Sequence, residues 1–307
     1  MINFRYHVVS LTAVFLALAI GLVVGTAALN GPLADNLQNQ VDELRKDNGN
    51  YRAQANQFHE ELNRSEEFAT ELAPALLAGK LTGRRIVVVV LPSGKDSADG
   101  VTKMLRVAGA TVTAQVTLQD KFLDPANARS ELLGLAEKAS RPTVEIDGLP
   151  LNSDGVETSS ALLARALLVK TPPVAEQDLT SVLAAYTASG YLEAGGEAVP
   201  GAEVTVVVSG LPPVDRDAGQ KNQHAVTVAT QFSKDRPVVV AGSGIGEGNL
   251  VSEVRNDPSL VQRVSTVDNA NTAQGQLATA LTVVERMTGK VGQYGLDATA
   301  RVPKTAP

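Results

Sequence analysis

The side chains that most often carry catalysis or hold metals are sparse in this chain. It contains no Cys, and three histidines are spread along it: His7, His59 and His224. The methionines are equally isolated: Met1, Met104 and Met287. No GxSxG, HExxH or CxxC pattern occurs. We therefore expect no catalytic residue and no resident cofactor, and the residues define no metal-ligand set. His224 could pair with a distant acid or Ser, but a lone histidine is more typical of a solvated surface than of an active site.

Two glycine-containing segments could bring backbone amides close to a ligand. The first, Leu91–Asp96, follows an apolar run, but a phosphate-binding loop would need Ser or Thr where Asp96 stands. The second carries four glycines at alternate positions: Gly242, Gly244, Gly246 and Gly248. A dinucleotide fingerprint also needs a helix after the glycines, and Asn249–Arg255 shows no clear helical pattern. A plain turn is the favoured interpretation at both places, with ligand binding at the second as the alternative.

An apolar segment near the amino end predicts contact with a membrane. Val8–Leu29 contains no Asp, Glu, Lys, Arg or His, and a helix of this length spans a hydrocarbon core of about 30 Å. Arg5 and His7 precede it and acidic Asp35 follows, which favours a cytoplasmic amino end. We expect a single-pass anchor in the cell membrane with the bulk of the chain extracytoplasmic. The alternative is a cleaved secretory signal ending at the small residues before Leu29.

A long heptad pattern follows this segment. Apolar residues recur at alternating spacings of four and three, which predicts a coiled-coil stalk over residues 33–73. Its predicted core is Leu37, Val41, Leu44, Asn48, Tyr51, Ala55, Phe58, Leu62, Ala69 and Leu72. Asn48 would favour a parallel two-stranded register, and Gly49 weakens the helix by about 1 kcal/mol. The alternative is a long amphipathic helix that packs back on its own globular domain.

Small residues within the apolar segment support self-association. They recur every fourth position and form one face for a close helix–helix contact: Ala13, Ala17, Gly21 and Gly25. Because this face precedes the heptads directly, we expect a parallel homodimer held by both segments. The lipid membrane is the other expected partner. Nucleic acid is not, because 27 Lys and Arg stand against 33 Asp and Glu.

The rest of the chain alternates between strand and helix patterns. The run Ile86–Leu91 is typical of a buried strand, and a helix over Asp96–Val107 and a strand over Ala110–Thr117 complete a βαβ unit. Further helices are predicted at 126–139, 159–168, 176–189, 216–232 and 272–288, and further strands at 203–208 and 237–241. This alternation predicts an α/β class: a three-layer domain with a mainly parallel sheet.

The domain organisation follows from these patterns. We predict a cytoplasmic amino end (1–7), a transmembrane helix (8–29), the stalk (33–73), an extracytoplasmic α/β domain (80–296) and a flexible tail (297–307).

Both ends of the chain resemble one known family. The opening Phe4–Gly21, the stretch Ser265–Ala270 with Gly275, and Gly289–Gly295 are similar to the MctB family of actinobacterial envelope proteins, which is also known as the SteB partner of a cell-separation pair. The resemblance implies copper efflux or copper resistance, a proposed pore-forming role and an outer-membrane location. It equally implies the alternative of a non-enzymatic dimeric scaffold with a SteA-like membrane partner in cell division. A copper ion as cargo is implied by the family alone, because soft Cu(I) prefers thiolate or thioether ligands that are scarce here.

Overall fold

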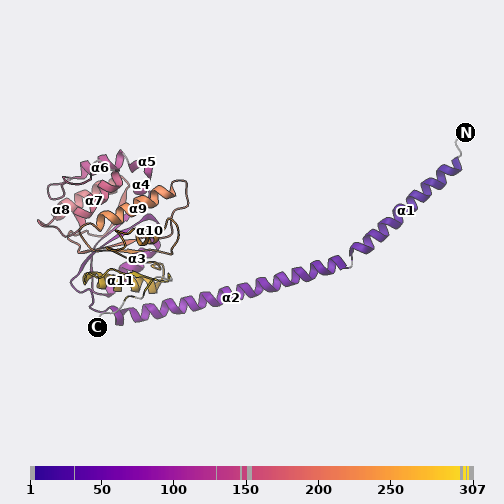
Figure 1. Ribbon diagram of the computed structural model, residues 1–307, viewed down its shortest axis with the longest axis horizontal. Helices are drawn as coiled ribbons and strands as arrows, with labels where there is room; N and C mark the ends of the chain where they lie inside the picture. Colours follow the sequence, from indigo (N-terminus) through magenta and orange to yellow (C-terminus); the bar gives the residue numbers. More distant parts are fainter. Residues whose placement is uncertain are drawn as a thin grey trace. The chain divides into compact units, whose positions relative to one another are not determined.

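A computed structural model describes residues 4–30, 32–128, 130–145, 147–150, 154–297, 300–301 and 303 (Figure 1). The chain divides into two compact units, Met1–Arg64 and Ser65–Pro307, and we call the second unit the head. Residues 1–3 of the predicted amino end and most of the predicted tail lie outside the described residues. Within the tail, the Arg301 amide donates to the Gln293 carbonyl at 2.9 Å.

The first unit begins with the apolar helix α1, Phe4–Asn30. Its stretch Phe4–Thr26 is long and apolar enough to cross a membrane. The hydroxyls of Thr12 and Thr26 donate to carbonyl oxygens one turn earlier, at 2.7 and 2.9 Å. Polar side chains satisfied within the helix itself are compatible with a lipid environment, where no water can bind them.

The second helix, α2, runs from Pro32 to Leu77. Pro32 suits the first turn of a helix, since its missing N–H would have had no partner there. The helix continues through Pro74, where the sequence pattern suggested an end. Ala73 and Leu77 are buried in the core of the head. This burial offsets the backbone hydrogen bond that Pro74 cannot donate.

The head is built on a seven-stranded sheet in the order β3-β2-β1-β4-β5-β6-β7. The strands are β1 (Arg85–Val90), β2 (Thr111–Leu118), β3 (Leu192–Gly195), β4 (Val204–Val208), β5 (Val238–Ala241), β6 (Val264–Val267) and β7 (Gln293–Tyr294). All neighbouring pairs are parallel except the pair of β2 with β3. The predicted α/β class with a mainly parallel sheet is confirmed.

Helices cover both faces of this sheet, giving three layers (Figure 1). One face carries α3 (Lys95–Val107), α11 (Ala273–Met287) and the last turns of α2. The other carries α4 (Asp120–Leu123), α6 (Glu131–Ala139), α7 (Gly155–Leu167), α8 (Glu176–Ala188), α9 (Ala218–Phe232) and α10 (Leu250–Asn256). The short α5 (Pro125–Ala128) joins α4 to α6, and the 3-10 turn η1 (Pro92–Gly94) precedes α3.

The strand residues explain these layers. Val87 and Val89 face the core beneath α7 and α9, whereas Ile86, Val88 and Val90 face the core beneath α3 and α11. Successive side chains of a strand point to opposite faces, so a continuous β-branched run fills two cores at once.

Several elements differ from the predicted ones. The helix expected over 126–139 is divided between α5 and α6. The short strands β3, β6 and β7 were not predicted. The residues Asn249–Arg255, which showed no clear helical pattern, do begin a helix: the Asn249 side chain accepts a hydrogen bond from the Val251 amide and caps α10. The seven residues of α10 are too few for a hydrophobic period to stand out.

Candidate functional site

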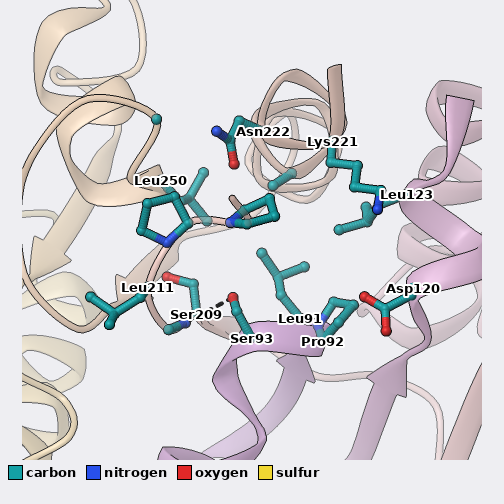
Figure 2. A pocket seen from close by; sticks show the side chains of 15 residues that line it. Leu91, Pro92, Ser93, Asp120, Leu123, Ser209, Leu211, Lys221, Asn222 and Leu250 are labelled. Atoms are coloured by element: carbon teal, nitrogen blue, oxygen red, sulfur yellow. Dashed lines mark hydrogen bonds between the residues drawn. The ribbon is translucent and has the colours of Figure 1, made fainter. Parts of the chain in front are cut away.

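A cavity of about 240 Å³ opens at the carboxyl ends of the central strands β1 and β4 (Figure 2). After β1 the chain passes to β2 on one side, and after β4 it passes to β5 on the other side. The connections therefore leave this point in opposite directions. In open α/β sheets such a topological switch point is the usual place for a ligand crevice. We call this site the switch-point cavity.

Two tight turns form the floor of the switch-point cavity. One follows β1 and the other follows β4, and the Gly210 amide of the second donates to the Ser93 hydroxyl of the first at 3.0 Å (Figure 2). A Cβ added at Gly210 would overlap the Ser93 carbonyl oxygen, and one at Gly94 would overlap the Val208 carbonyl oxygen. Close backbone contact therefore accounts for both glycines.

Leu91 lies at the centre of the cavity (Figure 2). Leu211 lies at one end, and Leu123 and Lys221 lie at the other (Figure 2). The apolar lining is completed by Pro92, Pro212, Pro213, Ala225 and Leu250. The cavity thus combines a largely apolar interior with polar groups at one end.

The charges at that end are mainly acidic. Lys221, on α9, forms an ion pair with Asp215. The hydrogen bond from Lys221 lowers the pKa of Asp215. The same bond raises the pKa of Lys221; burial opposes this rise, and the charges of Asp120 and Asp124 add to it. Lys221 is therefore a cation already balanced by carboxylates.

One buried polar group in the cavity lining has no partner. Ser209 is 2% exposed, and its hydroxyl makes no hydrogen bond within the described ranges. Leaving a buried hydroxyl unpaired costs about 1–3 kcal/mol. Its position directly after β4, next to Gly210, is the signal that sequence reasoning could have used, because ends of neighbouring parallel strands meet at one edge.

The glycine segment after β5 borders this site through one of its members. Gly248 lines the cavity, and a Cβ there would overlap the Asn222 side chain. Gly244, Gly246 and Gly248 have positive φ angles of 76°, 138° and 75°. Gly242 lies against Val251. Turn geometry and packing thus account for these glycines, and ligand binding by their amides stays a prediction.

His224 is not a solvated surface residue. It is buried, with Nδ1 2.7 Å from the Leu123 carbonyl oxygen and Nε2 3.2 Å from an Asp154 carboxylate oxygen. Asp154 also accepts from the Glu157 amide at the start of α7. Both ring nitrogens are therefore engaged in joining α9 to the α4 and α7 ends, and no hydrogen bond among the described residues links His224 to a serine.

The stretches near the carboxyl end that carry the family resemblance contact one another around a buried carboxylate. Buried Asp268 accepts from the Arg255 guanidinium at 2.9 Å and from the Leu296 amide at 2.7 Å. A Cβ at Gly295 would overlap the Asp268 carboxylate, and one at Gly275 would overlap the turn before α11. These residues hold β6, α11 and β7 together, so a structural role accounts for the motif.

The thioethers of the two described methionines, which are the soft metal ligands of the head, lie in or against its core. Met104 is buried, and Met287 packs against the same core under α3 and α11. Over the described part of the chain, no three His, Cys, Asp or Glu side chains group closely enough to hold a metal ion. The head thus uses its thioethers for packing.

The predicted self-association surfaces lie on α1 and on α2, most of which belongs to the first unit. Gly21 and Gly25 have open space where a Cβ would stand, and Ala13 and Ala17 are exposed. In the stalk, the exposed core positions are Leu37, Val41, Leu44, Asn48, Tyr51, Ala55, Phe58, Leu62 and Leu72. Ala69 is buried in this single chain, within the head. The coiled coil stays a prediction.

Fold and site define a class: an α/β head that follows a long helix and an amino-terminal apolar helix fit for a membrane anchor. Residues 1–303 match the family described as "Copper transport outer membrane protein, MctB". The chain therefore belongs to the MctB family, and the resemblance is confirmed. Proteins named "Copper transporter MctB" from Mycobacterium tuberculosis and Mycobacterium bovis are each 27% identical over 305 residues, covering 96% of both chains. The protein of that name from Mycobacterium leprae is 28% identical over 314 residues, with the same coverage.

Proposed function

We propose that this protein is a membrane-anchored component of copper transport, with its head outside the cytoplasm. The match of residues 1–303 to a copper transport family carries the proposal. The apolar stretch Phe4–Thr26 supplies the anchor. Arg5 precedes this stretch and Asp35 follows it, which favours retention of the amino end in the cytoplasm.

The head serves copper transport through contacts with other chains and does not carry the ion itself. Cu(I) prefers thiolate and thioether ligands, whereas this chain has no Cys, and Met104 and Met287 are used for packing. The largely apolar switch-point cavity is also unsuited to a bare cation. What the head offers instead is surface for another molecule.

The chain acts as a parallel homodimer. Exposed Leu37, Leu44 and Leu62 on the stalk would be covered by the same residues of a second copy. The open positions at Gly21 and Gly25 would let two α1 helices approach closely in lipid. The described residues contain one helix that could cross a membrane, and one such helix cannot enclose a channel, so a conducting form would need several chains around a shared axis.

A second candidate function is an envelope scaffold that engages a SteA-like membrane partner during cell separation. The exposed seam of the stalk favours it, because a long apolar helix face is a common docking element for other helices. The two functions differ in what the cell loses when the protein is absent.

Deletion of the gene in its native host separates these functions. We expect the deletion strain to become copper-sensitive, and the full chain to restore tolerance. A strain with normal copper tolerance that fails to separate after division would replace the copper role with the scaffold. Protease applied to intact spheroplasts checks the orientation: the head should be degraded, and a protected head would contradict the proposed topology.

Direct copper carriage is tested with the full-length protein in detergent. We expect a chromogenic Cu(I) chelator to retain the metal when the protein is titrated in. Stoichiometric Cu(I) binding at submicromolar affinity would show that the head or stalk ligates the ion, contrary to the proposed role.

A further inference from the structure

The switch-point cavity has the size of one large apolar side chain. A cavity of about 150 Å³ lined by apolar residues is sufficient to hold benzene. The present one measures about 240 Å³, with Leu91, Leu123 and Leu250 among its lining residues. An aromatic or long aliphatic group would therefore fit with little strain.

Exposed apolar side chains also lie on the two loops beside the cavity. Three exposed side chains on the loops after β4 and β5 form what we call the apolar rim: Leu211, Val214 and Ile245. Leu211 also lines the cavity, and a Cβ at Gly244 would be 3.5 Å from its side chain, so the two loops are adjacent. Val214 is 98% exposed. A ligand confined to the cavity would leave these groups in water, whereas a polypeptide would cover them.

The charge around the cavity selects the occupant. A second hollow of about 570 Å³ shares the lining residues Asn222 and Gly248 with the switch-point cavity, so the two are adjacent. Asp120 lines the first hollow, and Glu247 and Glu253 line the second. Among the described residues that line them, Lys221 is the one cation, and it is paired with Asp215. The groove is therefore acidic and complementary to a basic segment.

From these observations we infer that the switch-point cavity and apolar rim dock an extended segment of a partner protein. The segment carries one large apolar side chain that enters the cavity, flanked by Lys or Arg that meet Asp120 and Glu247. This inference deepens the proposed function, because it names the surface through which the head makes its contacts.

The test uses the full-length protein in lipid nanodiscs and three synthetic peptides: acetyl-Lys-Phe-Lys-amide, acetyl-Glu-Phe-Glu-amide and acetyl-Lys-Ser-Lys-amide. Binding is followed by ligand-observed NMR. We expect the first peptide to bind more than about tenfold tighter than either other, because the second reverses the charge and the third loses the apolar group.

Two pairs of variants place the binding on the molecule. Leu211→Asp should weaken the Lys-Phe-Lys peptide more than about fivefold, whereas Leu296→Asp, equally exposed on another loop, should not. Combined Asp120→Lys and Glu247→Lys should shift preference to the Glu-Phe-Glu peptide, whereas Glu137→Lys, at an exposed position of α6, should not. All these side chains are exposed, so the fold should persist, and circular dichroism verifies it.

Several results would overturn the docking surface. Equal binding of all three peptides, or equal effects of Leu211→Asp and Leu296→Asp, would do so. Phenethylamine binding as tightly as the Lys-Phe-Lys peptide would assign the cavity to a small molecule. Head dimers that dissociate in Leu211→Asp would assign it to a second copy. None of these measurements involves copper, so a wild-type gene that restores copper tolerance while the peptides fail to bind refutes this inference alone.

Discussion

The head and the first unit treat their apolar side chains in opposite ways. In the head, strand residues such as Val88 and Val207 are fully buried between helices of the same chain. In the first unit, Leu44, Tyr51 and Phe58 are more than half exposed on a helix that no other part of that unit covers. The head therefore completes its own core, whereas α1 and the stalk need lipid or another chain to cover them.

The comparison shows that a sequence can specify a helix without specifying what buries its apolar face. A repeat of 3.5 residues predicts a helix and the face that it will bury, but it does not contain the partner. The long α2 also includes Gly49, which costs about 1 kcal/mol in a helix interior. Most helical stability in proteins comes from packing an apolar face. We therefore expect the stalk to depend on assembly and the head to be independent of it.

The largest expected effect concerns the core of the head. Val88→Asp places a carboxylate in the middle of a sheet covered on both faces, and should cost at least about 4 kcal/mol of unfolding free energy. Denaturant unfolding followed by near-UV circular dichroism of the head tyrosines would measure it. The matched Leu44→Asp variant should leave that transition unchanged. A shared loss in both variants would mean that the head is not independent of the stalk.

The second prediction concerns assembly. Replacing Leu37, Leu44 and Leu62 together with Asp should convert a dimer to monomers in sedimentation velocity, because charges would oppose each other across the seam. The head transition should remain. The matched control replaces Glu43, Arg64 and Glu67 with Asp. These residues lie outside the seam, so this variant should preserve the dimer. An unchanged dimer in the leucine variant would move the self-association to another surface.

A glycine comparison within the head is expected to have a smaller effect. Gly210→Ala would force apart the two turns under the switch-point cavity and should cost about 2–4 kcal/mol. Gly134 on α6 has open space, so Gly134→Ala should stabilise the head by up to about 1 kcal/mol. Urea unfolding of both variants gives the two signs. Equal effects would show that the turn adapts to a side chain.

The sequence was informative wherever a local pattern decides the structure. The β-branched run of β1 and the helical period of α3 and α11 gave elements close to the observed ones, since burial on two faces leaves a strong signature. The strand β7 was missed because two residues have no period. The helix α10 was missed because its start depends on the Asn249 cap in a glycine-rich context.

The candidate site was harder to predict for a different reason. Ser93 is far in sequence from Ser209 and Lys221, and the three line one cavity only because β1 and β4 are neighbours. That pairing is a long-range property. Each glycine-rich loop could be recognised from the sequence, but which loops lie next to each other could not, because the order of the strands was unknown. Knowledge of the order would have pointed to the residues directly after β1 and β4.

The smallest predicted effect contrasts a long-range and a local carboxylate contact. In the head, Asp178 accepts from the Thr143 hydroxyl at 2.7 Å and from its amide at 2.9 Å, joining α8 to a distant loop. In the stalk, Asp42 pairs with Arg45 within one helical turn, at 3.5 Å. Only the first contact closes a loop of the fold, so only the first should affect unfolding of the head.

The hydrogen bonds from Thr143 lower the pKa of Asp178 below its ordinary value of 3.8. Because the folded state favours the ionised form, the contribution is present above that value and is lost as the pH falls through the lower, folded pKa. Asp178→Asn should therefore flatten the fall in head stability below about pH 4, whereas Asp42→Asn should leave the curve as in the wild type. Urea unfolding across that range measures both curves. If both variants follow the wild-type curve, the Thr143 contact contributes nothing, and the contrast between long-range and local carboxylates fails.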